Sequence, residues 1–166
     1  SINTTFKKIV LKIDHHQIFL MFKPLYLSDG KRIGMSSSSA HVIYASHILE
    51  HFSHREVSAV LSEWHRILKP GGEIFISVPD YSILSKMYNE NEEIEGIKMF
   101  LMGSQGNPFD FHRNIFDYPS LKALLEHADF SKIQPWGEND YLEYPFEDYA
   151  HYEPTRIISL NLKACK

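Results

Sequence analysis

The residues best suited to chemistry in this chain form one short segment, His47-Ile-Leu-Glu-His51. The pattern H-x-x-E-H is that of a reversed zinc-protease site, in which two histidines four residues apart share one face of a helix. Ser53 is a good helix-capping residue, so the helix is expected to begin only after both histidines. No third ligand is evident, and we therefore predict no metal site. His51 is then a turn histidine bonded to backbone, and His47 either lines a ligand pocket or is structural.

His112 is the second histidine that could take part in a reaction. It precedes Arg113 and follows a loop that contains Gly103 and Gly106, which is a plausible mobile lid. In this position His112 could bind an acceptor hydroxyl or remove its proton. The alternative is a solvent-facing pair at the end of a loop.

Two aspartates follow apolar runs that read as strands. Asp80 comes after the run 73–78 and either serves catalysis or caps the next helix. Asp14 ends the run 6–13 and either binds a ligand or caps the end of its strand. A third strand, 41–46, leads directly into the histidine segment.

The helix that follows this segment is the best specified element. Ser53 and Glu56 have the spacing of a capping box, and Phe52 and Val57 that of a hydrophobic staple. Apolar residues then recur at helical spacing, and Lys69-Pro-Gly-Gly72 ends the helix. The predicted stripe is Val57, Val60, Leu61, Trp64 and Leu68.

The second half of the chain continues the alternation of helices and strands. Residues 82–103 indicate an irregular helical region, and Pro119 suits the first turn of another helix. The run 131–136 predicts a strand, and the alternating run 158–164 predicts a last strand with one wet face. This order favours an α/β fold with a mostly parallel sheet. Ligands bind such sheets at the carboxyl ends of the strands, here Asp14, Ser46-His47 and Pro79-Asp80.

Composition limits the function classes. The chain has 166 residues, of which 43% are hydrophobic, and this is enough for one domain with a sizeable core. A net charge of −4 without a Lys/Arg cluster argues against nucleic-acid binding. The longest apolar run, 18–22, is too short to span a membrane. The single cysteine, Cys165, fits a reducing compartment, so we expect a cytoplasmic location.

The segments 44–52, 63–72 and 77–80 resemble the class I S-adenosylmethionine-dependent methyltransferases. The closest similarity is to small predicted methyltransferases associated with cell-surface glycan genes. The resemblance covers residues 25–166 and implies a single, partial methyltransferase-like domain over residues 1–166. It also implies a Rossmann-like sheet of seven strands, mostly parallel, with an antiparallel hairpin at its C-terminal edge.

The resemblance also implies a cofactor and its ligands. S-adenosylmethionine would lie across the strand ends, with Asp14 on the ribose hydroxyls and Asp29 near the adenine. Ser46 and His47 would line the methionine end, and His47, Asp80 and His112 are the catalytic candidates. The acceptor would be a small molecule, possibly glycan-related.

The sequence departs from this family at its N-terminal half. The first strand and its Gly-rich turn, through which backbone approaches the cofactor, are missing. We therefore expect an incomplete sheet, whose central gap closes by movement of another strand or by a second chain. We also expect weak or no cofactor binding, and a homodimer that covers the exposed edge. The alternative to a methyltransferase is a truncated, non-catalytic relative that serves binding or assembly.

Overall fold

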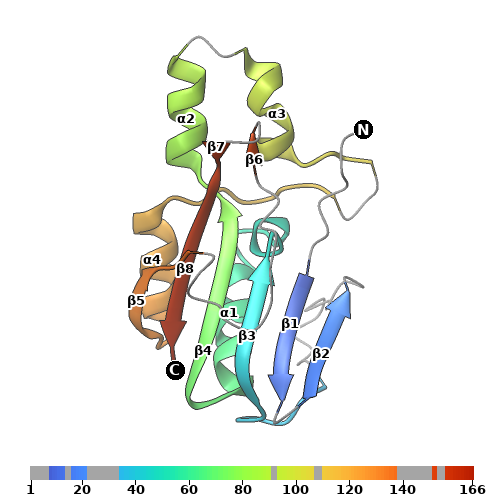
Figure 1. The fold of residues 1–166 in the computed structure, drawn as a ribbon, viewed down its shortest axis with the longest axis vertical. Helices are drawn as coiled ribbons and strands as arrows, with labels where there is room; N and C mark the ends of the chain where they lie inside the picture. Colours follow the sequence, from blue (N-terminus) through green and yellow to red (C-terminus); the bar gives the residue numbers. More distant parts are fainter. Residues whose placement is uncertain are drawn as a thin grey trace.

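The computed structural model describes residues 8–13, 16–21, 34–90, 93–106, 110–137, 151–152 and 156–166. Its strands and helices, in chain order, are β1 Lys8–Ile13, β2 His16–Met21, β3 Ala40–Ser46, a 3-10 turn Leu49–His51, α1 Val57–Ile67, β4 Leu68–Pro79, α2 Tyr81–Asn89, α3 Ile94–Met102, α4 Tyr118–His127, β5 Ser131–Pro135, β6 His151–Tyr152, β7 Arg156–Ile157 and β8 Ser159–Cys165 (Figure 1).

One sheet of six strands organises the described part of the chain, in the order β2-β1-β3-β4-β8-β5. β3 and β4 are parallel neighbours, and β8 lies antiparallel between β4 and β5. β2, β3, β4 and β5 therefore run in one direction, and β1 and β8 run in the other. The predicted α/β sheet with an antiparallel C-terminal hairpin is confirmed. It has six strands in the described residues where the resemblance implied seven.

The N-terminal strands show which of the two expected closures of the sheet occurs. β1 pairs directly with β3, so a strand of the same chain fills the place of the missing first strand. It is antiparallel to β3, with Lys8 opposite Ser46 and Lys12 opposite Val42. The carboxyl end of β1 therefore lies at the edge of the sheet opposite to Ser46. Only two residues join β1 to β2, and a connection of that length permits a hairpin but no parallel crossover.

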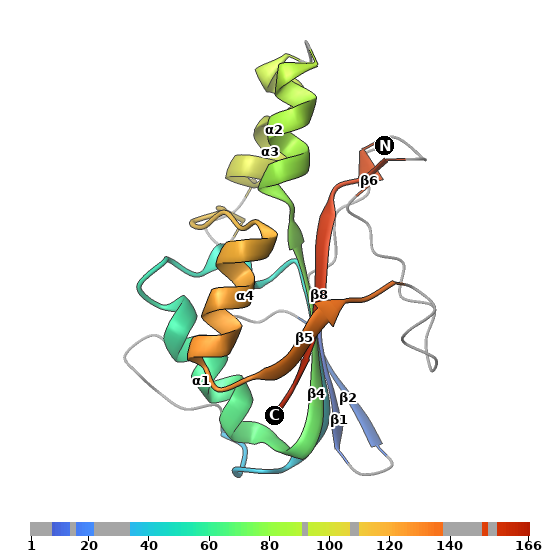
Figure 2. The same cartoon turned by 90° about the vertical axis from the view of Figure 1, so that its left-hand side faces the viewer.

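The helices α1 and α4 pack on one face of the sheet (Figure 2). Strand alternation sends Ile43, Ala45 and Ile76 to this face, where they join the buried stripe of α1. Tyr44 and Phe75 point to the other face and meet Trp136 at ring-centroid distances of 5.8 and 5.6 Å. All five residues of the predicted α1 stripe are buried. The period of 3.6 residues in the sequence thus predicted the covered face of the helix.

The start of α1 differs in detail from the predicted capping box. The Glu56 carboxylate accepts hydrogen bonds from the Ser53 backbone N–H at 2.8 Å and from the Ser53 hydroxyl at 2.7 Å. The hydroxyl is therefore used by the carboxylate, and regular helix begins only at Val57. These two hydrogen bonds from Ser53 lower the pKa of Glu56.

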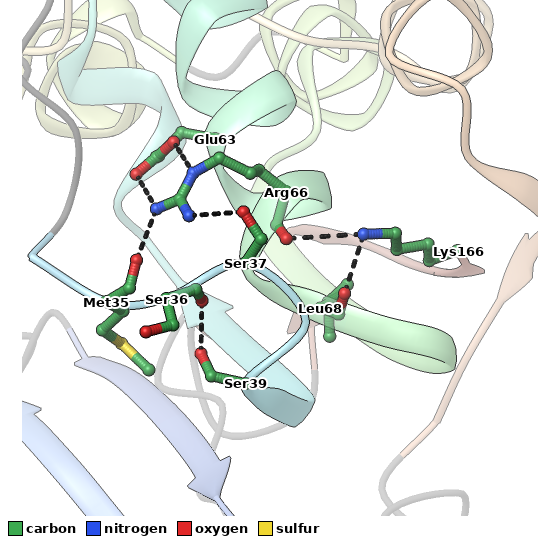
Figure 3. Close-up of polar contacts among 8 residues, drawn as sticks. All are labelled: Met35, Ser36, Ser37, Ser39, Glu63, Arg66, Leu68 and Lys166. Carbon is green, nitrogen blue, oxygen red and sulfur yellow. Dashed lines mark hydrogen bonds and ion pairs between the residues drawn. The ribbon is translucent and has the colours of Figure 1, made fainter.

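The end of α1 is held by a cluster of polar contacts shown in Figure 3. Arg66 donates two hydrogen bonds to the Glu63 carboxylate, at 2.6 and 2.7 Å, and further ones to the Ser37 hydroxyl at 3.0 Å and the Met35 carbonyl at 2.8 Å. The Ser38 and Ser39 backbone N–H groups donate to carbonyls of the last helical turn, at 3.0 and 2.8 Å. The run of four serines, Ser36–Ser39, thus satisfies carbonyls that the helix itself leaves unpaired.

The α2–α3 pair projects beyond the carboxyl edge of the sheet (Figures 1 and 2). The predicted irregular helix over 82–103 is therefore two helices that pack through Leu84, Met87 and Ile97. α3 ends at Gly103, whose φ is +75° and where an added Cβ would collide with the Asp110 carbonyl. No helix among the described residues is long and apolar enough to cross a membrane.

Candidate functional site

The candidate site lies at the carboxyl ends of β3 and β4. Ser46 and Ser77 are register partners there, and the His47 backbone N–H donates to the Ser77 carbonyl at 2.8 Å. Ser77 in turn donates from its hydroxyl to the Asn161 side chain on β8 at 2.7 Å. A row of polar side chains therefore crosses three strands at this edge.

His47 turns the chain sharply at the end of β3. Its φ is +50°, in the left-handed region that is costly for a residue with a Cβ. Its imidazole is buried between two polar groups: Nε2 lies 3.2 Å from the Ser159 hydroxyl, and Nδ1 lies 3.3 Å from Glu50 Oε1. A carboxylate only accepts, so Nδ1 carries the proton in this arrangement and the Ser159 hydroxyl donates to Nε2.

Glu50 is the most deeply buried charged group of the site, with a side chain 1% exposed. The Nε2 atoms of His51 and His112 both lie 3.9 Å from its Oε1. Burial acts to raise the pKa of Glu50. The contact with His47 and the charges that His47, His51 and His112 can carry outweigh burial and lower the pKa to about 2. Neither carboxylate oxygen has a well-aligned hydrogen bond, so the contact with His47 is electrostatic.

His51 and His112 are oriented by backbone carbonyls. Nδ1 of His51 lies 2.9 Å from the Phe111 carbonyl, and Nδ1 of His112 lies 2.7 Å from the Phe100 carbonyl. The two rings meet edge to face, with centroids 4.7 Å apart. The predicted backbone bond of His51 is therefore present, and His112 packs inward instead of facing solvent.

The segment that carries His112 is also bound through its backbone. The N–H groups of Arg113 and Asn114 both donate to the Glu50 carbonyl, at 2.8 and 3.1 Å. The 3-10 turn after β3 and the segment before α4 are therefore joined by side-chain and main-chain contacts.

The other predicted site residues lie elsewhere. Asp80 caps α2, since its side chain accepts from the Ser82 backbone N–H at 2.8 Å. This is the capping alternative. Asp14 and Asp29 are outside the described residues. β1, which precedes Asp14, runs toward the opposite edge of the sheet, so it does not lead to the carboxyl edge that the ribose assignment required.

Sequence reasoning missed the central place of Glu50 and the third member of its cluster. Ligand atoms of Glu50, His51 and His112 all lie within 4.8 Å of one another. The prediction of no metal site rested on the position of both histidines before the helix and on the lack of an evident third ligand; His112, 61 residues after His51, lies in that third position. His47 and His51, the pair that the zinc pattern suggested, do not form this group together. The one signal in the sequence was a Glu directly after the apolar pair Ile48-Leu49.

A sheet with parallel β3 and β4 and a polar layer at their carboxyl ends belongs to the α/β class that binds ligands at that edge. Residues 9–134 match the model of a family described as a methyltransferase domain, which is more than half of the chain. The chain belongs to this methyltransferase domain family, and its fold is that of the class I enzymes.

Solved structures show the same fold at low sequence identity. A possible exported protein of Bordetella parapertussis has a TM-score of 0.52 and 12% identity, over 80% of this chain and 40% of that one. An S-adenosylmethionine-dependent methyltransferase of Thermotoga maritima, described as a possible histamine N-methyltransferase, has a TM-score of 0.50 and 18% identity, over 81% and 60%. The 1,6-didemethyltoxoflavin-N1-methyltransferase of Burkholderia thailandensis, solved with S-adenosylhomocysteine, has a TM-score of 0.48 and 17% identity, over 79% and 45%.

The chain thus spans between 40% and 60% of the length of these three structures. No curated protein sequence matches it.

Proposed function

We propose that this chain is a methyltransferase that takes its methyl group from S-adenosylmethionine and gives it to a small acceptor with a hydroxyl group, of the glycan class. The observation that carries the proposal is the family match over residues 9–134, together with Ser46 and His47 at the carboxyl end of β3. The cofactor is inferred from the resemblance to class I enzymes. The acceptor class rests on the glycan-associated relatives that the sequence resembles.

The described residues fit one end of this cofactor. Ser46 and His47, with the Ser77 hydroxyl beside them, offer hydrogen-bonding groups to its methionine part. The chain leaves β1 at the other edge, and Asp14 and His15 stand where a glycine turn is expected. The sequence directly after β1 contains no glycine for the adenosine part, and weak binding is expected.

S-adenosylmethionine supplies an activated methyl group on a positively charged sulfur. An acceptor hydroxyl attacks that carbon, the carbon–sulfur bond breaks, and its electron pair stays on sulfur. The protein has to hold donor and acceptor in line and take the hydroxyl proton. We propose His47 as the catalytic residue that takes it, at Nε2, where the acceptor hydroxyl would replace the Ser159 hydroxyl as hydrogen-bond donor while Glu50 faces the other nitrogen.

Asp80 and His112 are the less favoured catalytic candidates. The Asp80 carboxylate caps α2, and the His112 Nδ1 faces the Phe100 carbonyl. Each side chain is therefore held by a hydrogen bond to the backbone.

Calorimetric titration with S-adenosylhomocysteine tests the cofactor. We expect a dissociation constant on the order of 100 μM, which corresponds to about 5.5 kcal/mol. Transfer of a radiolabelled methyl group to a panel of sugars and small alcohols tests the reaction. His47→Gln should lower kcat by at least about tenfold, because glutamine cannot take the hydroxyl proton. Equal kcat in the variant would contradict the role of His47.

The antiparallel direction of β1 favours a second candidate, a non-catalytic relative that serves binding or assembly. It predicts no heat of binding with S-adenosylhomocysteine up to millimolar concentration and no methyl transfer. Dissociation in the low micromolar range would contradict both this candidate and the expectation that binding needs the glycine turn.

A further inference from the structure

The environment of Glu50 is incomplete for a buried carboxylate. Both of its oxygens are inaccessible to water and lack a hydrogen-bond partner among the described residues. A charged group in this state costs several kcal/mol unless another charge compensates it. The nearest groups on the side away from His47 are the Nε2 atoms of His51 and His112, both 3.9 Å from Oε1. That separation is too long for a hydrogen bond.

The protonation of the two histidines follows from their other nitrogen atoms. A backbone carbonyl only accepts, so the Nδ1 atoms of His51 and His112, at 2.9 and 2.7 Å from carbonyls, carry protons. In the neutral rings Nε2 then has a lone pair. Two lone pairs beside a carboxylate attract a cation. A ring N–H held by a backbone carbonyl is also the usual support of a histidine that binds a metal.

We propose that Glu50, His51 and His112 bind one divalent transition-metal ion, of the class of Zn²⁺, Co²⁺ or Fe²⁺. Two imidazole nitrogens and one carboxylate oxygen are the ligands this class prefers, whereas Ca²⁺ and Mg²⁺ prefer oxygen alone. Ligands about 2.1 Å from a tetrahedral ion lie about 3.4 Å apart. The two 3.9 Å separations from Glu50 therefore need to shorten by about half an ångström, and the separation between the two histidine ligand atoms, which is within 4.8 Å, by at most about 1.4 Å.

The location gives this ion a specific effect. Glu50 and His51 lie on the turn after β3, and His112 lies on the segment before α4. The ion would therefore cross-link the two segments that meet beside the strand ends. Three protein ligands leave a coordination position for water or for an acceptor oxygen. Binding of this ion requires only these three side chains and does not depend on methyl transfer.

A proton is the competing cation. If one of the two rings is protonated at Nε2, it compensates Glu50 without any metal. The same buried cluster would then be a charge pair that holds the two segments together.

A titration of the whole chain with metal ions distinguishes a bound metal ion from a bound proton. Protein freed of metal by a chelator is titrated with Zn²⁺ in a calorimeter and with Co²⁺ in a spectrophotometer. We expect one ion per chain and a visible absorption band for bound Co²⁺. His51→Asn and His112→Asn keep an amide donor for the backbone carbonyl and remove the Nε2 ligand, so each should weaken binding by at least about tenfold. His54→Asn, at an exposed position three residues from His51, is the matched control and should bind as the parent does.

No binding by the parent chain would overturn the proposal in favour of the protonated cluster. Equal binding by His112→Asn would overturn it as well. Circular dichroism of the metal-free variants shows whether they are folded, so lost binding is not confused with unfolding. Because no cofactor is present, these results stand apart from the titration with S-adenosylhomocysteine.

Discussion

At the scale of single residues, His47 combines an unusual backbone with a constrained side chain. Its φ of +50° lets the imidazole reach both Ser159 and Glu50 from the end of β3. A strained conformation is retained only where the surrounding contacts outweigh its cost, and such positions cluster at functional sites. His47 is therefore the residue at which backbone geometry and chemistry coincide.

The backbone of His47 can be tested apart from its side chain. We expect His47→Gly to be more stable than His47→Ala by about 1 kcal/mol, because only glycine adopts a positive φ without cost. Urea unfolding of both variants measures the difference. The matched control is Ser62, an exposed position inside α1, where Gly should be less stable than Ala by about 1 kcal/mol. The same sign at both positions would contradict the left-handed conformation of His47.

At the scale of elements, the two ends of α1 are fixed by different means. The N-terminal end uses a local contact between Ser53 and Glu56, whereas the C-terminal end uses the serine run and Arg66. Arg66 reaches Met35 and Ser37, about 30 residues away in the sequence, and so joins the chain before β3 to the helix after it. The four serines Ser36–Ser39 thereby terminate the helix.

The contribution of Arg66 should be well above that of a surface ion pair. Its side chain is 19% exposed and that of Glu63 is 7% exposed, and the pair is bidentate. We expect Arg66→Ala to lower the free energy of unfolding by about 2 kcal/mol, less than for a fully buried pair because Arg66 keeps some contact with water. Lys98→Ala breaks an exposed pair with Glu95 at the same spacing and should change it by less than about 0.5 kcal/mol. Equal losses of unfolding free energy for the two variants, measured by chemical denaturation, would contradict the larger contribution of Arg66.

The cap of α4 predicts a dependence on pH. Asp117 accepts from the Ser120 backbone N–H at 3.0 Å, and the hydrogen bonds from Ser120 lower the pKa of Asp117 below its usual 3.8. A lowered pKa in the folded state stabilises the protein above pH 3.8, and this contribution is lost as the pH falls through the lowered value. Asp117→Asn keeps the acceptor without the charge. Its deficit in stability should be the same at pH 7 and at pH 5 and should shrink as the pH falls below 3.8 in unfolding experiments; a deficit that stays constant below pH 3.8 would show that the charge has no role.

At the scale of the whole molecule, the N-terminal hairpin of β1 and β2 forms one edge of the sheet. β1 pairs with β3, and β2 forms the edge of the sheet among the described strands. The homodimer expected from the sequence stays a prediction, but its basis changes. β3 is paired on both sides, and among the described strands β2 and β5 form the two edges of the sheet; β2 is an edge strand without proline.

A dimer joined through β2 should be visible by sedimentation equilibrium. We expect association in the range of tens of micromolar, because one short edge strand buries less surface than a typical stable interface. Ile18→Pro removes a backbone donor from β2 and should weaken association. Ser62→Ala, at an exposed position inside α1, is the control and should leave association unchanged. A monomer at millimolar concentration would contradict this prediction.

Much of the fold could be predicted because its signals are local. The apolar spacing of α1 and the continuous apolar run of β4 depend on neighbours in the sequence, and both are found in the structure. The direction of β1 could not be predicted, because it depends on pairing with a strand more than 25 residues away. The Glu50 cluster was missed for the same reason, since His112 and Phe111 come from a distant segment whose approach no local pattern indicates.

The two amide groups that donate to the Glu50 carbonyl provide a direct measure of opening at this edge. The N–H groups of Arg113 and Asn114 lose their acceptor whenever the segment before α4 separates from the turn after β3. Their exchange with deuterium therefore reports the rate at which the strand ends become accessible. A small molecule or ion that bridges the two segments should slow that exchange. It should do so at a lower ligand concentration than the one needed to raise the thermal midpoint of the whole protein.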